Sequence, residues 1–526
     1  MPDEIKKVLE KQLWSIADIL RGKMSADQYR DYILGFIFYK YLSEKLSLRA
    51  NKYLKQWWRD DHYPDIDENT EEWKKVLSVI EDYMLKELGY YLKPSELFEK
   101  IAQKWNNITE REETSFILDT LKKILKNIET STMGTDSEDD FNHLFEDLDL
   151  DAQKLWKTPN ERNKLIVQIL LKLDAIDFKL EDIDSDILGD AYEYLIAKFA
   201  SGAGKSAGEF YTPQEVSTIL AKVVTTGKNK LKTVYDPTCG SGSLLLRVAR
   251  EVEEVGEFFG QELNRTTYNL ARMNMILHDV SYSRFDIRQE DTLEKPMHID
   301  HRFEAIVANP PFSAKWNAND LKEWDDRFSQ YGSLAPKSKA DYAFITHMIH
   351  HLDDNGTMAV VLPHGALFRG ASEWRIRKYL IDDRNYLDAV IGLPSNIFFG
   401  TSIPACIMIF KKCRKQWEDI LFIDASSEFE KWKNQNRLRP EDIEKITNTY
   451  RKRESIEKYS HLASLDEVAE NDFNLNIPRY VDTFEEEEPI DIDAVAAKIK
   501  DIEKNSKALD DKIGEYCKEL GISSPF

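Results

Sequence analysis

The sequence predicts a doubly wound α/β fold in the middle of the chain, with a helical region on each side of it. Between Thr233 and Phe410, apolar runs with the length of buried strands alternate with amphipathic runs long enough for helices. The first apolar run ends in a glycine-rich turn, residues 237–243, that leads straight into a helix. Such alternation builds a mostly parallel sheet with helices on both faces, in the Rossmann-like arrangement.

Residues 1–170 are expected to form an N-terminal helical domain. Apolar side chains recur at helical spacing in residues 13–20, and residues 29–38 continue in a strongly apolar helix. Helical periodicity resumes in residues 166–173, after an acidic stretch. No pattern in this region points to chemistry of its own, so docking of other molecules is its expected role.

Residues 171–412 are expected to form the α/β domain. Before one of its helices, Thr212 is a suitable N-cap, with Pro213 at the first helical position and Glu215 completing a capping box. The last strand of the sheet is expected to end by Lys412. The expected helices cover residues 187–199, 213–224, 244–252, 341–352 and 372–381, and the expected strands cover residues 233–236, 257–261, 305–308, 357–362, 387–393 and 404–410.

Residues 413–526 form a C-terminal region that is acidic and mostly helical by pattern. From Ile492 to Leu520, apolar residues repeat at steps of three and four over about four heptads, interrupted only by Ser506. This seam predicts either a coiled-coil arm that grips another subunit or a helix packed on its own domain.

Composition limits the possible classes of function. The chain has 526 residues, and no apolar run approaches the roughly 18 residues of a membrane span. Its start lacks a signal-peptide pattern and its four cysteines lack paired spacing, which indicates a protein of the reducing cytoplasm without a zinc site or disulfide framework. The net charge of −22 is unfavourable for gripping nucleic acid directly. Either the substrate is not nucleic acid, or basic surface is local, or a partner holds the DNA.

Polar groups end four consecutive strands, at Asp236, Glu262, Asp291 and Asn309. Ligands of open α/β sheets bind at the carboxyl ends of the strands. Asp236 is suited to a cationic amine, and Glu262, after the second strand, to the hydroxyls of a ribose. The turn Gly240-Ser241-Gly242 lacks the third glycine of a dinucleotide fingerprint. An amino-acid–nucleoside conjugate, S-adenosylmethionine, fits this combination.

The fourth strand runs into Asn309-Pro310-Pro311-Phe312. Two prolines fix the backbone and remove two N–H donors, which leaves carbonyl groups free to accept hydrogen bonds beside an amide and an aromatic ring. An amino group on a planar ring needs those contacts: two acceptors, and a face to stack on. The same residues also suit an ordinary turn at the end of a strand.

Taken together, five segments of the chain resemble the modification (M) subunit of type I restriction–modification systems, a gamma-type adenine-N6 DNA methyltransferase. They are residues 34–42, 208–214, 236–242, 309–312 and 474–480, and they extend over nearly the whole chain. The combination is specific, whereas Asn-Pro-Pro-Phe alone also fits glutamine-directed protein methyltransferases. The resemblance implies a Rossmann-like, S-adenosylmethionine-dependent catalytic domain between an N-terminal helical domain and a helical tail that docks other subunits.

The resemblance also implies roles for individual residues. Asp236 would hold the methionyl amine of S-adenosylmethionine, and Asp291 its adenine. Asn309 and the carbonyl of Pro310 would bind the target amino group, with Phe312 and Tyr211 stacking on the flipped base. The other cofactor-binding residues would be Glu209, Phe210, Tyr211, Thr212, Pro213, Gln214, Gly240, Ser241, Gly242, Ser243 and Glu262.

The implied activity is methyl transfer to the N6 amino group of a flipped adenine at a specific DNA sequence, without a metal. The implied partners are DNA, a specificity (S) subunit clasped by two M subunits, and a restriction (R) subunit in the full complex, with no membrane. Two alternatives remain open: methylation of protein glutamine or of RNA, and a non-catalytic assembly subunit that binds S-adenosylmethionine. The sequence lacks a complete phosphate-binding loop, which argues against a nuclease or translocase.

Overall fold

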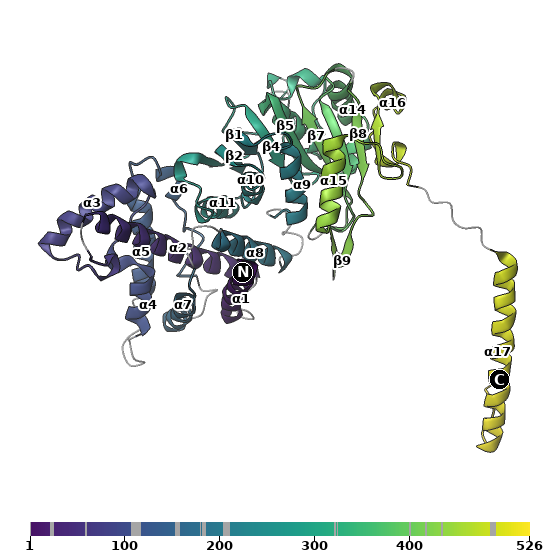
Figure 1. Cartoon of the computed structure of the whole chain (residues 1–526), viewed down its shortest axis with the longest axis horizontal. Coiled ribbons are helices and arrows are strands. Elements are labelled where there is room, and N and C mark those ends of the chain that lie inside the picture. The colour runs from purple at the N-terminus through teal and green to yellow at the C-terminus, as the bar shows by residue number, and fades with distance from the viewer. Residues whose placement is uncertain are drawn as a thin grey trace. The chain divides into compact units, whose positions relative to one another are not determined.

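The computed structural model describes most of the chain as two compact units, Met1–Val481 and Asp482–Phe526 (Figure 1). None of the described helices combines the length and the apolar character that a membrane crossing needs. The described residues are 2–20, 26–57, 60–106, 117–152, 158–178, 180, 186–202, 211–319, 322, 324–398, 401–415, 418–432, 435–483 and 491–525.

The N-terminal part of the first unit is helical, as predicted. Its long helix α2 (Ala26–Gln56) is buried on every side from Tyr32 to Ser43, which is typical of a helix at the centre of a bundle. The other helices of this part are α1 (Pro2–Leu20), α3 (Glu71–Glu87), α4 (Phe98–Asn106), α5 (Ile117–Ser131), α6 (Glu138–Phe141), α7 (Pro159–Asp174) and α8 (Ile187–Gly202).

A nine-stranded mixed sheet follows, in the order β11-β8-β6-β7-β5-β4-β1-β2-β3. Its neighbours are parallel, except that β7 is antiparallel to β5 and β6, and β11 to β8. The strand order reverses between β1 and β4, which is where an open α/β sheet leaves a crevice for its ligand. The strands are β1 (Lys230–Asp236), β2 (Glu254–Glu262), β3 (Phe285–Gln289), β4 (Phe303–Ala308), β5 (Leu352–Pro363), β6 (Leu387–Gly392), β7 (Ala405–Lys411), β8 (Ile420–Asp424) and β11 (Ser460–Ala463).

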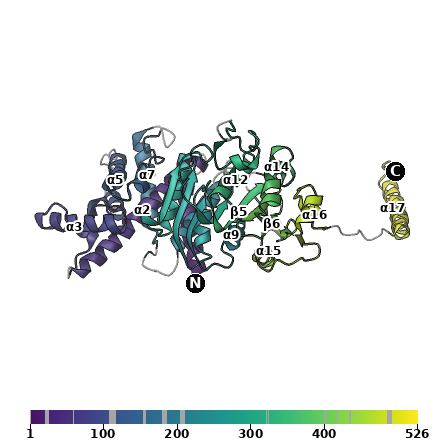
Figure 2. The same cartoon turned by 90° about the horizontal axis from the view of Figure 1, so that it is seen from above.

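Helices cover both faces of this sheet, so its central strands are buried on both sides. In β4, Ala305 and Val307 lie in one hydrophobic core and Ile306 and Ala308 in the other, because successive strand residues point to opposite faces. Figure 2 shows α12 and α14 on one side of the strands, and α9 and α15 on the other. The helices that follow the first part are α9 (Gln214–Val224), α10 (Ser243–Ala249), α11 (Arg265–Leu277), α12 (Asp341–His351), α13 (Gly365–Phe368), α14 (Ser372–Lys378), α15 (Pro440–Lys452) and α16 (Leu465–Glu470).

The prediction that the sheet ends by Lys412 is wrong. β8 pairs in parallel with β6, and β11 pairs antiparallel with β8, so residues from the predicted C-terminal region complete the sheet. The apolar run Ile420 to Ile423 is fully buried there, and the first compact unit continues to Val481. The predicted boundary at residue 170 stays a prediction.

The second unit contains the helix α17 (Ile492–Glu519). Asp491 caps its start, accepting a hydrogen bond from the backbone N–H of Ala494 over 2.9 Å. Ile513 of the predicted seam is half-buried. The other apolar residues of the seam, on the helix and just after its end, are exposed: Ile492, Val495, Ile499, Ile502, Leu509, Tyr516 and Leu520.

Candidate active site

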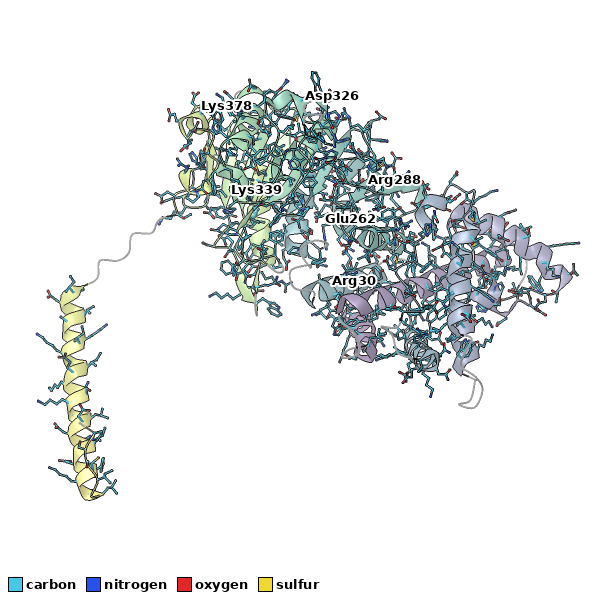
Figure 3. The ribbon with its side chains drawn as sticks, turned by 180° about the vertical axis from the view of Figure 1, so that it is seen from behind. Arg30, Glu262, Arg288, Asp326, Lys339 and Lys378 are labelled. Atoms are coloured by element: carbon cyan, nitrogen blue, oxygen red, sulfur yellow. The ribbon has the colours of Figure 1, made fainter. Side chains whose placement is uncertain are left out.

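A cavity of about 940 Å³ lies at the carboxyl ends of β1 to β4. Three of the residues predicted from the strand ends, Glu262, Asp291 and Asn309, line it together. Arg30 and Asp31 of α2 line it as well; Figure 3 labels Arg30 of α2 and Glu262 at the end of β2. The structure therefore places the N-terminal helices against the same cavity as the strand ends.

Asp236, at the end of β1, is buried beside this cavity with one oxygen unsatisfied. Its Oδ1 accepts hydrogen bonds from the backbone N–H of Thr238 (2.9 Å) and from Thr238 Oγ1 (3.4 Å). Its Oδ2 is buried and has no partner among the described residues. Burial raises the pKa of this carboxyl to about 8. A cationic amine would satisfy Oδ2 and restore the ionised form, so Asp236 fits the group predicted for it, although only its neighbours Pro237 and Thr238 line the cavity.

The glycine-rich turn after β1 is hydrogen bonded to Glu262 at the end of β2. Gly240 and Gly242 have φ of 54° and 77°, a left-handed conformation that costs a glycine little. Glu262 Oε2 accepts a hydrogen bond from the N–H of Gly240 (3.0 Å), and its Oε1 accepts one from the N–H of Asn264 (2.8 Å). The predicted residues Ser241, Gly242 and Ser243 do not line the cavity, and the Oγ atoms of the two serines lie 3.0 Å apart.

The segment after β3 is fixed by two cations that sequence reasoning missed. Asp291 accepts hydrogen bonds at Oδ1 from the N–H groups of Leu293 (2.9 Å) and Glu294 (3.2 Å). The buried Arg327 donates to the carbonyls of Thr292 (2.9 Å) and Leu293 (3.0 Å). Lys322 donates to the Leu293 carbonyl over 2.7 Å. Both cations lie in the polar loop between β4 and α12, where the sequence gives no periodic signal.

Asn309, just after β4, is hydrogen bonded to Thr212, just before α9. Asn309 Nδ2 donates a hydrogen bond to Thr212 Oγ1 over 3.0 Å. The predicted capping box is therefore wrong: α9 begins at Gln214 with Pro213 in the N-cap position, and no side chain caps it. The hydroxyl that would have capped the helix orients the amide of Asn309 instead.

The rest of the Asn-Pro-Pro-Phe turn is supported by its surroundings. Phe312 packs edge-on against Phe398, with ring centroids 5.6 Å apart. Asp341 accepts a hydrogen bond from the N–H of Ser313 (3.0 Å), and Arg369 pairs with the same carboxylate (2.6 Å). Pro310 is buried, and within the described part of the chain no hydrogen bond reaches its carbonyl.

A second cavity, of about 750 Å³, lies beside the first turn of α9. Tyr211, Pro213 and Gln214 line it, together with Asn396, Phe398 and Trp432. These three predicted residues therefore face a different space from Glu262 and Asp291. Two other predicted residues, Glu209 and Phe210, lie outside the described residues.

Family models match almost the whole chain. The model described as N-6 DNA Methylase matches residues 183–489, and the one described as HsdM N-terminal domain matches residues 9–173. The chain belongs to the N-6 DNA methylase family.

The relatives of this N-6 DNA methylase are type I restriction enzyme methylase subunits. The MpnII methylase subunit of Mycoplasma pneumoniae is 38% identical over 99% of this chain and 97% of that protein. The MjaVII methylase subunit of Methanocaldococcus jannaschii is 32% identical over 98% of this chain and 85% of that protein. A crystal structure of a type I restriction–modification methyltransferase subunit from Streptococcus thermophilus is 44% identical, with a TM-score of 0.82 over 91% of this chain and 100% of that one. The chain is thus a DNA methyltransferase of the type I methylase-subunit family, as the resemblance implied.

Arg30 and Asp31 are the largest omission from the predicted site of this N-6 DNA methylase. They come from the helical region matched by the HsdM N-terminal model, more than 200 residues before Glu262 in the sequence. The same region also grips the first turn of α11, where Asp147 accepts hydrogen bonds from Thr266 (2.7 Å) and Asn269 (2.8 Å). No local pattern announces such long-range contacts, so the sequence offered no signal for them.

Proposed function

We propose that this chain transfers a methyl group from S-adenosylmethionine to the N6 amino group of an adenine flipped out of DNA. The observation that carries the proposal is the position of Asn309. Asn309 lines the 940 Å³ cavity with Glu262 and Asp291, and its Nδ2 donates a hydrogen bond to Thr212. The proposal also assigns residues 1–170 as a helical domain, the α/β region from residue 171 through the strands that complete its sheet as the catalytic domain, and the tail as a docking arm.

The buried Oδ2 of Asp236 supports the assignment of the cofactor. A methionyl ammonium group would supply the hydrogen bonds that this oxygen lacks. Glu262 and Asp291 would bind the ribose and the adenine, because both line the cavity and each carboxylate oxygen can accept more than one hydrogen bond. Glu209, Phe210 and the turn from Gly240 to Ser243 belong to the same proposal. Tyr211, Pro213 and Gln214 line the 750 Å³ cavity and Thr212 is hydrogen bonded to Asn309, so we assign these four residues to the surroundings of the target base. When bound, S-adenosylmethionine supplies an electrophilic sulfonium methyl group, which requires no metal.

The chain's own residues would make the target nitrogen reactive by positioning it. Because Asn309 Nδ2 donates to Thr212, the amide oxygen Oδ1 points the other way and can accept from an amino group. The Pro310 carbonyl would accept the second N–H. Holding both hydrogens favours a pyramidal nitrogen whose lone pair is no longer delocalised into the ring, so rate enhancement comes from positioning and electrostatics. Phe312 would stack on the flipped base, with Tyr211 at the neighbouring cavity, and offset part of the cost of unstacking.

The net charge of −22 supports a division of labour between subunits. An S subunit would select the DNA site, two M subunits would clasp it, and an R subunit would join the full complex. The exposed apolar seam of α17 is the candidate arm for the S subunit. All four cysteines are free thiols, which supports the cytoplasm as the compartment.

The first experiment follows labelled methyl groups from S-adenosylmethionine into DNA. The chain is tested alone and co-expressed with the S subunit, with Asn309→Ala as control. Label in N6-methyladenine only with the complex supports the proposal, and label from the chain alone means that it recognises DNA unaided. Label in protein or RNA instead of DNA supports the alternative substrates, and binding of the cofactor without any transfer supports an assembly role.

A further inference from the structure

A small hairpin stands apart from the nine-stranded sheet. It consists of β9 (Glu430–Trp432) and β10 (Gln435–Arg437), which form a separate antiparallel pair among the described strands. In Figure 1, β9 projects away from the sheet near α9 and α15. All three residues of β9 are exposed, and Trp432 has 54% of its surface open. Residues 430–437 contain three cations and one carboxylate in a chain whose net charge is −22.

Residues of β10 contact two segments near the Asn309 turn: the loop after β6, and α9. The N–H of Asn436 donates a hydrogen bond to the carbonyl of Asn396 (3.0 Å), and its Nδ2 donates one to the carbonyl of Ser395 (2.8 Å). Arg437 pairs with Glu215 of α9 over 2.8 Å. Because Phe398 follows Asn396 closely and packs on Phe312, the hairpin is held at a fixed position relative to the turn.

The hairpin also forms a wall of the 750 Å³ cavity. Trp432, Asn436 and Arg437 face Tyr211 and Lys198 there. Among the described residues, the two cavities have no lining residue in common. Thr212 lies in the chain between Tyr211 and Pro213, which line the 750 Å³ cavity, and is hydrogen bonded to Asn309, which lines the other. A DNA strand whose flipped base reaches Asn309 must also place the neighbouring nucleotides somewhere on the protein. The 750 Å³ cavity lies next to the Asn309 site, and aromatic and cationic side chains line it.

We propose that the β9–β10 hairpin and its cavity hold the DNA strand next to the flipped base. Trp432, which lines the cavity, stacks on a base adjacent to the flipped adenine. Lys431 is exposed on the other face of β9, outside the lining of the cavity, and neutralises a backbone phosphate of the same strand where it passes over the hairpin. The inference rests on the proposed function and adds an element to it that grips DNA.

Charge and composition favour nucleic acid over a protein as the occupant. Exposed lysine beside an exposed tryptophan, with amide side chains around them, is the combination that single-stranded nucleic-acid sites use. A protein-docking core is depleted of lysine and rich in clustered apolar groups. Trp432 is the only large apolar side chain in residues 430–437, so a protein partner would find little to bury.

The test uses the complex of this chain with its S subunit. Plasmid DNA methylated by the wild-type complex is sequenced to find the methylated site, and a labelled duplex containing that site serves as the probe. Binding is measured by fluorescence anisotropy over a series of salt concentrations, and methyl transfer is measured on the same duplex.

Two variants are expected to behave differently. Lys431→Gln should lower the slope of log K against log salt by about one, because one phosphate contact is lost. Trp432→Ala should weaken duplex binding and raise the KM for DNA by about five- to a hundredfold with the salt slope unchanged, because only stacking is lost. Neither variant should change kcat or the affinity for S-adenosylmethionine.

Matched controls come from exposed residues of the same types elsewhere in the chain. Trp324→Ala and Lys75→Gln should leave DNA binding unchanged, since neither residue belongs to the hairpin or lines its cavity. Wild-type affinity and salt slope in both hairpin variants would overturn the inference, and so would loss of the S subunit from the purified complex, which would make the hairpin a protein-docking element. A wild-type complex that methylates no DNA would refute the proposed function itself.

Discussion

The side-chain amide of Asn309, at the end of β4, donates a hydrogen bond to the hydroxyl of Thr212, just before α9, over 3.0 Å. The bond crosses from the strand that ends in the turn to the helix that follows the N-terminal region. In this arrangement the amide oxygen Oδ1 is the end that can accept from a ligand.

Thr212→Val should slow methyl transfer without weakening the binding of S-adenosylmethionine. The substitution keeps the shape of the side chain but leaves Asn309 Nδ2 without its acceptor. A hydrogen bond of this kind contributes about 1 kcal/mol, so we expect kcat to fall about fivefold. Steady-state kinetics of the complex with its S subunit will measure the change. Thr212→Ser keeps the hydroxyl and should retain most of the rate; equal losses in both variants would show that the hydrogen bond does not orient the amide.

Asn309→Ala should abolish methyl transfer while S-adenosylmethionine still binds. The variant removes an acceptor for the target amino group, and losing one electrostatic contact of this kind typically costs about a hundredfold or more in kcat. Titration calorimetry will report cofactor affinity, and labelled methyl transfer the rate. A parallel loss of both quantities would assign Asn309 to cofactor binding instead.

Asp236 should make the cofactor-free protein less stable as pH rises. Its folded pKa of about 8 lies above the unfolded value of 3.8, so the folded state binds more protons between these two values. The free energy of unfolding should therefore fall as pH rises from about 4 to about 8. Asp236→Asn cannot ionise, so its Tm should lose that part of the pH dependence and exceed the wild-type Tm most clearly near pH 8.

The cofactor gives an independent check on Asp236. Asp236→Asn should bind S-adenosylmethionine more weakly, because the neutral amide cannot pair with an ammonium group. Calorimetry in two buffers of different ionisation enthalpy should also show that wild-type binding releases a proton at pH 7 and that the variant's does not. The same proton release from both proteins would exclude Asp236 as the amine-binding group.

Deletion of residues 490–526 should separate the chain from its S subunit. The exposed seam of α17 would be lost, while the unit Met1–Val481 keeps its own core. Co-purification of tagged S subunit with the full-length and shortened chains will test this, with Tm as a control for the remaining fold. A shortened chain that still co-purifies would assign the S-subunit contact to the first unit.

The central fold could be predicted because its strands are long apolar runs with polar ends. The rule that parallel strands present their carboxyl ends at one edge brought Glu262, Asp291 and Asn309 together correctly. The strands that were missed carry weaker signals. β11 has four residues and pairs only with β8, and the helical pattern around both strands dominated the interpretation of residues 413–526.

The errors at the site have tertiary causes. Thr212 satisfies every local rule for an N-cap. Its hydroxyl has another partner because the fold brings Asn309, 97 residues later in the sequence, next to it. Arg30 reaches the cavity because α2 packs near α11, which no local pattern encodes. Arg327 and Lys322 lie in a loop, where the sequence has no periodic pattern. Their hydrogen bonds to the carbonyls of Thr292 and Leu293 could therefore not be predicted.

The 940 Å³ and 750 Å³ cavities share no lining residue, and this separation bears on the order of events in a catalytic cycle. On the proposed assignment, the flipped base and the cofactor occupy the 940 Å³ cavity together, while the neighbouring nucleotides occupy the 750 Å³ cavity. A strand held in the second cavity would keep its contacts there while the methylated base and the spent cofactor leave the first. The complex would then stay on its DNA between the two steps.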